Sequence, residues 1–248
     1  MSALARDIER MLDPAKLMEQ AGLPPDPWQE AVLRSEAKRM LLLCSRQSGK
    51  STTCAALACS SAIYEPGLVL LIAPAQRQSV ELFRKVADVY HSLQDVPKIV
   101  QESTMRLELA NGSRIIALPG TEQTIRGYSG VRLCIVDEAA RVDDELFAAV
   151  RPMLATVNGR FVALTTPFGK RGWFWDAWDR GEGWERTKVT ADQCPRIDAD
   201  WLADEKRLIG PFQYGQEYDC EWLDLESQFF ASDLINAALR EDVPALWN

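Results

Sequence analysis

Nine consecutive residues have the types and spacing needed to bind the phosphates of a nucleotide. They read Cys44-Ser45-Arg46-Gln47-Ser48-Gly49-Lys50-Ser51-Thr52, and they stand between an apolar run and a segment of helical character. In such a phosphate loop, backbone N–H groups at a helix N-terminus surround the β-phosphate, Lys50 reaches the β- and γ-phosphates, and the Ser51 hydroxyl binds Mg²⁺. The usual pattern begins with glycine, where this chain has Cys44. A Gly-Lys-Ser triplet alone is a weak signal, but its place between a strand and a helix favours nucleotide binding over a plain turn.

Two neighbouring acids, Asp137 and Glu138, end a second apolar run at residues 133–136. A phosphate loop requires such a partner, because an acidic residue at a strand end holds Mg²⁺ through water. We therefore expect Asp137 to hold the metal and Glu138 to polarise the water that attacks the γ-phosphate. A kinase must exclude water, so this glutamate favours hydrolysis. The alternative is that both acids are solvated at the start of a helix, where negative charge is favourable in any case.

The composition excludes several other chemistries. The chain has a single histidine, His91, so zinc sites with two histidines and facial metal triads lack the imidazoles they need. The 28 basic and 36 acidic residues give a net charge of −8. This charge argues against a surface coated in positive charge for nucleic acid, although it does not exclude a local basic patch.

The cysteines and the N-terminus indicate a cytosolic protein. No two of the six cysteines have the CxxC spacing, so we expect small core residues in a reducing compartment, without disulfides or a zinc site. The N-terminus carries Asp7 and Glu9 where a signal peptide would need an apolar run. No apolar run approaches the ~20 residues of a membrane span, so we expect no membrane association.

Alternating helical and apolar segments must hold these groups in place. Helices are expected at 3–21, from Asp26, and at 51–64, 79–93 and 145–154, and buried strands at 40–44, 68–73, 133–136 and 161–165. A hairpin is expected around Asn111-Gly112-Ser113, between residues 106–109 and 114–118. The alternation predicts an α/β fold with a mostly parallel sheet that helices cover on both faces. From about Asp192 onward, strand signals fade and helical segments rich in Trp and Tyr follow.

In the order of its motifs, the chain resembles the large subunit of tailed-phage terminase, the motor that packages double-stranded DNA. Members carry Arg-Gln inside the phosphate loop, and their first loop position is often not glycine, which accounts for Cys44. The other matching motifs are Trp28-Gln29, Arg126-Gly127, Val136-Asp137-Glu138-Ala139-Ala140, Thr165-Thr166-Pro167, Gly172-Trp173-Phe174 and Gln216-Glu217-Tyr218. The resemblance covers the chain from Trp28 to about Phe230.

The resemblance also implies roles for individual residues. Arg46 would contact the γ-phosphate within its own subunit, whereas Arg126 would be the arginine finger inserted into a neighbouring subunit's site. Gln29 would read adenine, and Thr165 and Thr166 would sense hydrolysis as a coupling motif. Each has a plainer interpretation from the residues: Gln29 fits position N3 of a capping box, Arg126 fits a solvated loop, and the threonines fit the end of a strand.

Two further groups of residues are weaker candidates. The aromatic residues at helical spacing favour core packing over base stacking; they are Trp173, Phe174, Trp175 and Trp178. Several basic residues are candidate contacts to the DNA backbone, although such runs are more often a solvated face; they are Arg77, Arg84, Lys85, Lys170 and Arg171.

For the whole chain, the resemblance implies a P-loop NTPase core of the RecA type (ASCE) with a small helical lid, using ATP and Mg²⁺. The expected division is an N-terminal arm at 1–25, an ATPase core at 26–191, a lid at 192–230 and a tail at 231–248. The expected partners are double-stranded DNA, other copies in a homo-oligomeric ring, a pentamer on the portal protein, and the small terminase subunit. The setting would be the host cell cytoplasm, as a phage or prophage protein.

Two alternatives remain open, and one activity is not expected. A helicase-like DNA-dependent ATPase would need a second RecA-type domain to supply an arginine in cis. A non-hydrolysing nucleotide-binding interaction module would bind nucleotide without turnover. Family members normally continue into an RNase H-like nuclease, whereas this sequence ends at Asn248, so we expect no nuclease activity from it.

Overall fold

One mixed sheet forms the centre of the protein. The structure is a computed structural model, and it describes residues 2–120, 125 and 127–223. In these residues eight strands form a sheet of order β3-β4-β5-β2-β6-β7-β1-β8. The strands are β1 (Arg39–Cys44), β2 (Leu68–Ala73), β3 (Ile99–Glu102), β4 (Arg106–Leu109), β5 (Arg114–Pro119), β6 (Val131–Asp137), β7 (Arg160–Thr165) and β8 (Glu185–Val189). The pairs from β5 through to β8 are parallel, and β4 pairs antiparallel with β3 and β5.

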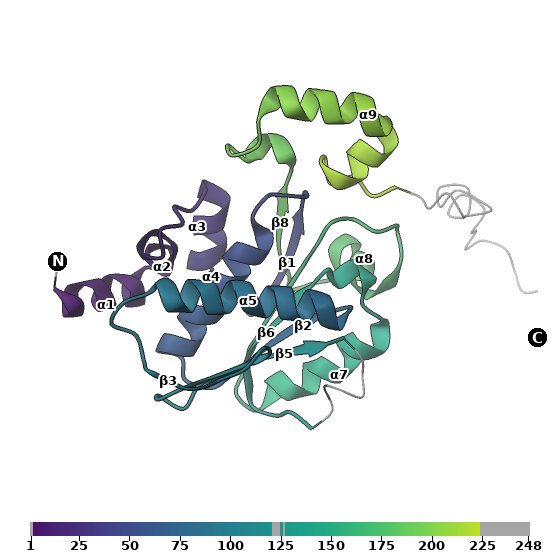
Figure 1. Cartoon of the computed structure of the whole chain (residues 1–248). Coiled ribbons are helices and arrows are strands. Elements are labelled where there is room, and N and C mark those ends of the chain that lie inside the picture. The colour runs from purple at the N-terminus through teal and green to yellow at the C-terminus, as the bar shows by residue number, and fades with distance from the viewer. Residues whose placement is uncertain (1, 121–124, 126, 224–248) are drawn as a thin grey trace, which may run out of the picture.

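Helices cover both faces of the sheet (Figure 1). They are α1 (Ala3–Leu12), α2 (Ala15–Gln20), α3 (Pro27–Arg34), α4 (Lys50–Tyr64), α5 (Gln76–Ser92), α7 (Asp144–Ala155), α8 (Gly172–Asp179) and α9 (Ala199–Glu217), with 3₁₀ turns η1 (Ala139–Arg141) and η2 (Ala191–Gln193). No helix in the described part of the chain is long and apolar enough to cross a membrane.

The apolar residues of β1 show how the two layers of core arise. Met40 and Leu42 pack into a cluster that includes residues of α2 to α5, whereas Leu41 and Leu43 pack into a cluster with α7 and α8. Side chains alternate between the faces of a strand, so an uninterrupted apolar run has both faces buried. The expected α/β fold, with a mostly parallel sheet covered on both sides, is confirmed.

Several boundaries differ from the expectation. The helix expected at 3–21 is two helices, because the chain turns at Asp13-Pro14, where the Ala15 N–H donates to the Asp13 side chain instead of a preceding carbonyl. The helix expected at 79–93 begins at Gln76. Strands β3 and β8 were not predicted, because most of their residues are exposed at the sheet edges and form no apolar run.

Helix α9 lies apart from the sheet, above the C-terminal end of β1 in Figure 1. It is kinked at Gly210, whose φ of 80° is not helical, and Pro211 follows. Trp201, Leu208 and Phe212 are its exposed large apolar side chains. The part of the expected tail and lid that falls within residues 224–248 lies outside the described residues.

Candidate nucleotide site

Three neighbouring parallel strands bring the candidate groups to one edge of the sheet. β7 lies between β6 and β1, with Asp137 opposite Leu164 and Thr165 opposite Leu43. The chain leaves β1 into the phosphate loop, leaves β6 at Asp137, and leaves β7 at Thr165. Carboxyl ends of parallel strands are where α/β folds place their ligands.

The phosphate loop connects β1 to the first turn of α4. The Ser45 N–H donates to the Val189 carbonyl of β8 at 2.8 Å, and the Ser48 hydroxyl donates to the Ser45 carbonyl at 2.9 Å. Gln47 and Gly49 have φ values of 60° and 91°, in the left-handed region. These bonds and turns curl the loop over the start of α4, where free N–H groups and the helix dipole favour a phosphate.

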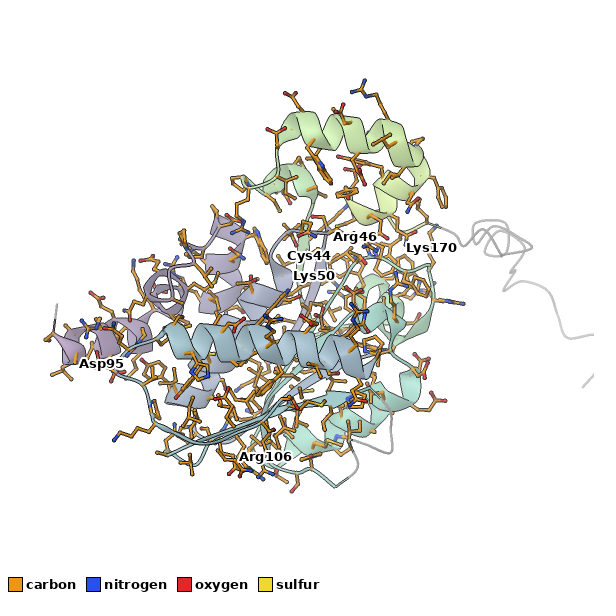
Figure 2. The ribbon with its side chains drawn as sticks, in the orientation of Figure 1. Cys44, Arg46, Lys50, Asp95, Arg106 and Lys170 are labelled. Carbon is orange, nitrogen blue, oxygen red and sulfur yellow. The ribbon has the colours of Figure 1, made fainter. Side chains whose placement is uncertain are left out.

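The acids meet the first residues of α4. The Ser51 hydroxyl donates to Asp137 Oδ2 at 3.2 Å, and Lys50 Nζ lies 3.2 Å from Glu138 Oε1. The Glu138 N–H in turn donates to Asp137 Oδ1 at 2.9 Å. Glu138 itself has a φ of 49°, an uncommon backbone conformation for a non-glycine residue that turns its side chain back toward the loop. Figure 2 shows Lys50 between α9 and the sheet.

The donor set fits Mg²⁺. Burial raises the pKa of Asp137 above its usual range, although the Lys50 charge partly opposes the shift; a cation would supply the compensation that burial removes. The described residues contain no group of three His, Cys, Asp or Glu side chains that could hold a metal alone. Mg²⁺ usually takes one or two carboxylates, waters and the substrate's phosphates, and Asp137 with the Ser51 hydroxyl provides such a half-site.

Arg46 faces α9. Its Nε lies 2.6 Å from Glu217 Oε2, and its backbone N–H donates to the Glu217 carbonyl at 2.9 Å. Next to it, Gln216 Nε2 donates to the Pro167 carbonyl at 2.9 Å. Two adjacent residues at the end of α9 therefore contact both the phosphate loop and the loop after β7. The phosphate contact expected for Arg46 stays a prediction.

Gln29 is fully buried beside the phosphate loop. Its Oε1 accepts from the Asp26 N–H at 2.8 Å, which completes the capping box that the sequence offers as the plainer interpretation. Its Nε2 donates to Thr53 Oγ1 at 2.8 Å, and it lies 3.5 Å from the Gly49 carbonyl. The side chain is thus placed against the loop, and adenine recognition stays a prediction.

The two threonines are buried at the end of β7. Thr165 Oγ1 donates to the Thr166 carbonyl at 2.7 Å and accepts from the Ala140 N–H at 3.4 Å. This second bond ties the strand end to η1, the turn that follows Glu138. Arg126, the expected arginine finger, lies outside the described residues.

The aromatic and basic candidates separate into different regions. Trp173 and Phe174 are buried in the core, where Trp173 stacks on Phe147 with ring centroids 4.4 Å apart, so the core-packing interpretation is confirmed for them. Arg77 and Lys85 of α5 line a cavity of about 380 Å³ together with Ser51, Asp137 and Glu138. A larger cavity of about 870 Å³ lies against α7 and α8, away from these acids.

Two arginines at the site were not predicted from the sequence. Arg196 Nη2 donates to Asp26 Oδ2 at 2.8 Å and to the Ser48 carbonyl at 3.1 Å. Arg141 Nε lies 3.8 Å from Glu138 Oε2, on the turn η1. Arg141 follows Glu138 by three residues, a spacing that the sequence shows, whereas nothing in the sequence pairs Arg196 with Asp26.

The chain is similar to large subunits of phage terminases in sequence and in fold. A family model described as terminase large subunit, T4-like virus type, N-terminal, matches residues 41–237. The terminase large subunit of Thermus phage G20c is 25% identical over 263 residues, a match that covers 90% of this chain and 54% of that protein. The chain therefore spans about half the length of this relative.

Solved structures show the same fold. The large terminase ATPase domain of Thermus phage P74-26 superposes with a TM-score of 0.69 at 22% identity, over 83% of this chain and 97% of that one. The large terminase of bacteriophage HK97 also gives 0.69, at 17% identity, over 92% of this chain and 58% of that one. A large terminase from a thermophilic bacteriophage, solved in complex with ATP-gamma-S, gives 0.61 at 12% identity, over 79% of this chain and 52% of that one. The likeness shows the RecA-like P-loop fold.

Proposed function

The chain belongs to the family of terminase large subunits of the T4-like virus type, N-terminal part, and on this basis we propose that it is a Mg²⁺-dependent ATPase that drives double-stranded viral DNA into a procapsid. One observation supports the ATPase activity most directly. Ser51 lies 3.2 Å from Asp137, and Lys50 lies 3.2 Å from Glu138, as expected of a phosphate loop and its acidic partner. The complex of the thermophilic phage's terminase with ATP-gamma-S supports nucleotide binding by this fold.

Phosphate binding, metal binding and proton transfer would each fall to different residues of the site. Lys50 and the N–H groups at the start of α4 would hold the β- and γ-phosphates, and Ser51 and Asp137 would hold Mg²⁺. The metal, when bound with the nucleotide, supplies positive charge to the β- and γ-phosphate oxygens. Once Lys50 turns to a phosphate, Glu138 loses the nearer of its two cationic neighbours and its carboxylate can accept a proton from the attacking water.

Arg46 would connect the nucleotide to α9. To reach a γ-phosphate its guanidinium must leave Glu217, which is buried at the end of α9. We propose residues 192–230 as the lid, 26–191 as the ATPase core and 1–25 as an arm. The separation of Arg46 from Glu217, together with the bond of Gln216 to the Pro167 carbonyl, would then move the lid during each hydrolysis cycle.

A DNA-packaging motor acts together with other proteins, and membership of the terminase family supports the partners proposed here. We propose a homo-oligomeric ring, a pentamer on the portal protein, in which Arg126 of one copy completes the site of the next, and the small terminase subunit as a further partner in the host cytoplasm. An arginine finger is worth ~10³–10⁵ in rate. An isolated copy would therefore hydrolyse ATP slowly.

ATP turnover tests the catalytic part of the proposal. Glu138→Gln keeps the size of the side chain but removes the base, so we expect turnover to fall by about 10²–10⁴-fold while nucleotide still binds. Glu182→Gln, at an exposed loop position, is the matched control and should behave as the wild type. Full activity of Glu138→Gln would refute the assignment.

The concentration dependence of turnover tests the assembly. A rate per chain that rises steeply with protein concentration, and further with double-stranded DNA, supports the ring. A measurable rate that is independent of protein concentration and rises with DNA would instead indicate the helicase-like ATPase. No turnover at any concentration, with nucleotide bound, would indicate the interaction module.

A further inference from the structure

Arg141 connects the acid of the site to the loop after β7. It is the last residue of η1, and its N–H donates to the Glu138 carbonyl at 2.9 Å. This tight turn brings the two side chains together, with Arg141 Nε 3.8 Å from Glu138 Oε2. The other oxygen of the same carboxylate faces Lys50 Nζ at 3.2 Å. Glu138 therefore lies between two cations, one from the phosphate loop and one from its own turn.

The guanidinium of Arg141 also lies over an aromatic ring. Its Cζ is 4.0 Å from the centroid of Phe168, the residue that follows Thr165-Thr166-Pro167. Arg171 approaches the same ring at 5.3 Å. The Ala140 N–H, one residue away, donates to Thr165 Oγ1. The turn that carries Arg141 thus has two contacts with this region: the Ala140 N–H bonds the last residue of β7, and the Arg141 side chain packs on Phe168 in the loop that follows.

Lys50 and Arg141 differ in whether a bound nucleotide would compete for them. Lys50 has a second partner in the phosphates, because it is the first residue of the helix that receives them. Arg141, by contrast, contacts Glu138 of its own turn and Phe168, which both lie outside the phosphate loop. Binding of nucleotide would therefore draw Lys50 away from Glu138 without removing a contact of Arg141.

We propose that Arg141 is a positioning residue: held by Phe168, it orients the Glu138 carboxylate toward the attacking water once Lys50 has turned to the phosphates. This rests on the ATPase function proposed above. The guanidinium attracts Oε2 as an ion-pair partner and leaves Oε1, the oxygen that Lys50 would release, to accept the proton. Small displacements of a reacting group are expensive, about 10²-fold in rate for 1 Å.

The same contacts would make the orientation depend on α9. Gln216 of α9 holds the Pro167 carbonyl, and Phe168 is the next residue. Displacement of α9 therefore pulls on the residue that fixes Arg141. A positioning residue of this kind couples the rate of the chemical step to the state of the loop, without touching the nucleotide.

Steady-state kinetics of Arg141→Met and Phe168→Leu test the proposal. We expect Arg141→Met to lower kcat by about 30–100-fold and Phe168→Leu by about 10-fold, with the affinity for ATP-gamma-S and the melting temperature close to wild type. The double variant should be no slower than Arg141→Met alone, because Phe168 is proposed to act only through Arg141. Arg141→Lys keeps the charge without the planar group, and should recover part of kcat.

A matched control exists on α7. Arg151 lies over Phe147 at 5.8 Å, an arginine–aromatic pair outside the site, and Arg151→Met should leave kcat unchanged. The proposal is overturned if Arg141→Met behaves like Arg151→Met, if it weakens ATP-gamma-S binding as much as it lowers kcat, or if the effects of the two substitutions multiply. Glu138→Gln and the wild type in the same series keep the two proposals apart. No turnover by the wild type would refute the ATPase, and full activity of Glu138→Gln would refute Glu138 as the base. An inactive Glu138→Gln beside a fully active Arg141→Met would refute only the role of Arg141.

Discussion

Gly49 has a backbone conformation in the phosphate loop that favours glycine. Its φ is 91°, and a Cβ at this position would lie 2.8 Å from Arg196 Nη2 and 3.0 Å from Gln29 Nε2. Both the backbone conformation and the space therefore favour glycine. The Gly-Lys-Ser signature reflects this backbone requirement as well as the chemistry of Lys50.

Substitution of Gly49 by alanine separates the two requirements. Gly112, in the β4–β5 hairpin, has a φ of 87° with nothing within 4 Å of an added Cβ, so Gly112→Ala measures the backbone strain alone, about 1–3 kcal/mol. Gly49→Ala should lower the free energy of unfolding by more than this, because Arg196 and Gln29 must move. Urea unfolding and binding of a fluorescent nucleotide check the prediction. Equal losses of stability, or unchanged nucleotide binding by Gly49→Ala, would contradict it.

Local residue patterns could be predicted from the sequence, and distant pairs could not. The loop and the Asp-Glu pair are each contiguous, so a strand on one side fixes where their side chains go. Arg46 and Glu217 are 171 residues apart, and Arg196 and Asp26 are 170 apart. Such pairs depend on how whole segments fold back on each other, which periodicity and local motifs do not encode.

At the scale of elements, two ion pairs attach α9 to the core, one at its C-terminal end and one just before its N-terminal end. Glu217 at its end pairs with Arg46, and Arg196 shortly before its start pairs with Asp26. The arginines are largely exposed and the acids largely buried, so each pair is worth about 0.5–1 kcal/mol. The two pairs are of similar strength, but only one involves the arginine expected at the γ-phosphate.

This difference gives a prediction for nucleotide discrimination. Glu217→Gln frees Arg46, so it should tighten ATP-gamma-S binding by about 2–5-fold and leave ADP binding unchanged, because ADP has no γ-phosphate. Asp26→Asn is the control: it cuts the other ion pair but keeps the helix cap, and it should not change the ratio of the two affinities. Calorimetry with both nucleotides measures this ratio. An equal effect on ADP, or the same ratio in both variants, would count against a γ-phosphate contact by Arg46.

The elements themselves were predictable where burial left a clear pattern. The apolar runs of β1, β2, β6 and β7 are buried on both faces, and each was expected. Strand β8 was not, because Val189 is its one buried residue and the other four are exposed or half-buried. An edge strand is held by backbone hydrogen bonds to its one neighbour, and these bonds do not require an apolar pattern in its side chains.

At the scale of the whole molecule, the six cysteines set a limit on stability at high pH. All are buried and free, and burial raises the pKa of each thiol, for Cys220 to about 12. Below the ordinary thiol pKa of about 8.5 the folded and unfolded states are both protonated. Above it only the unfolded chain loses protons, so stability falls as pH rises, by about 1.4 kcal/mol per thiol and pH unit.

Urea unfolding between pH 7.5 and 10 in the presence of reductant measures this slope. We expect a steep loss of stability, and Cys59→Ala should reduce the slope by the share of one thiol, because Cys59 is fully buried. The comparison of slopes removes the contributions of lysine and tyrosine, which both proteins share. Identical slopes in the two proteins would contradict the prediction.

The place of β1 in the sheet has a consequence for synthesis on the ribosome. Both of its neighbours come late in the chain: β7 begins at residue 160 and β8 at residue 185, whereas β1 ends at residue 44. At a synthesis rate of ~5–20 residues per second, β1 waits about 6–23 seconds for its first partner. β2 and β5, by contrast, can pair as soon as residue 119 has emerged. The strand that carries the phosphate loop is therefore among the last to be secured, and a nascent chain acquires its nucleotide site only when nearly all of the described sequence has left the exit tunnel.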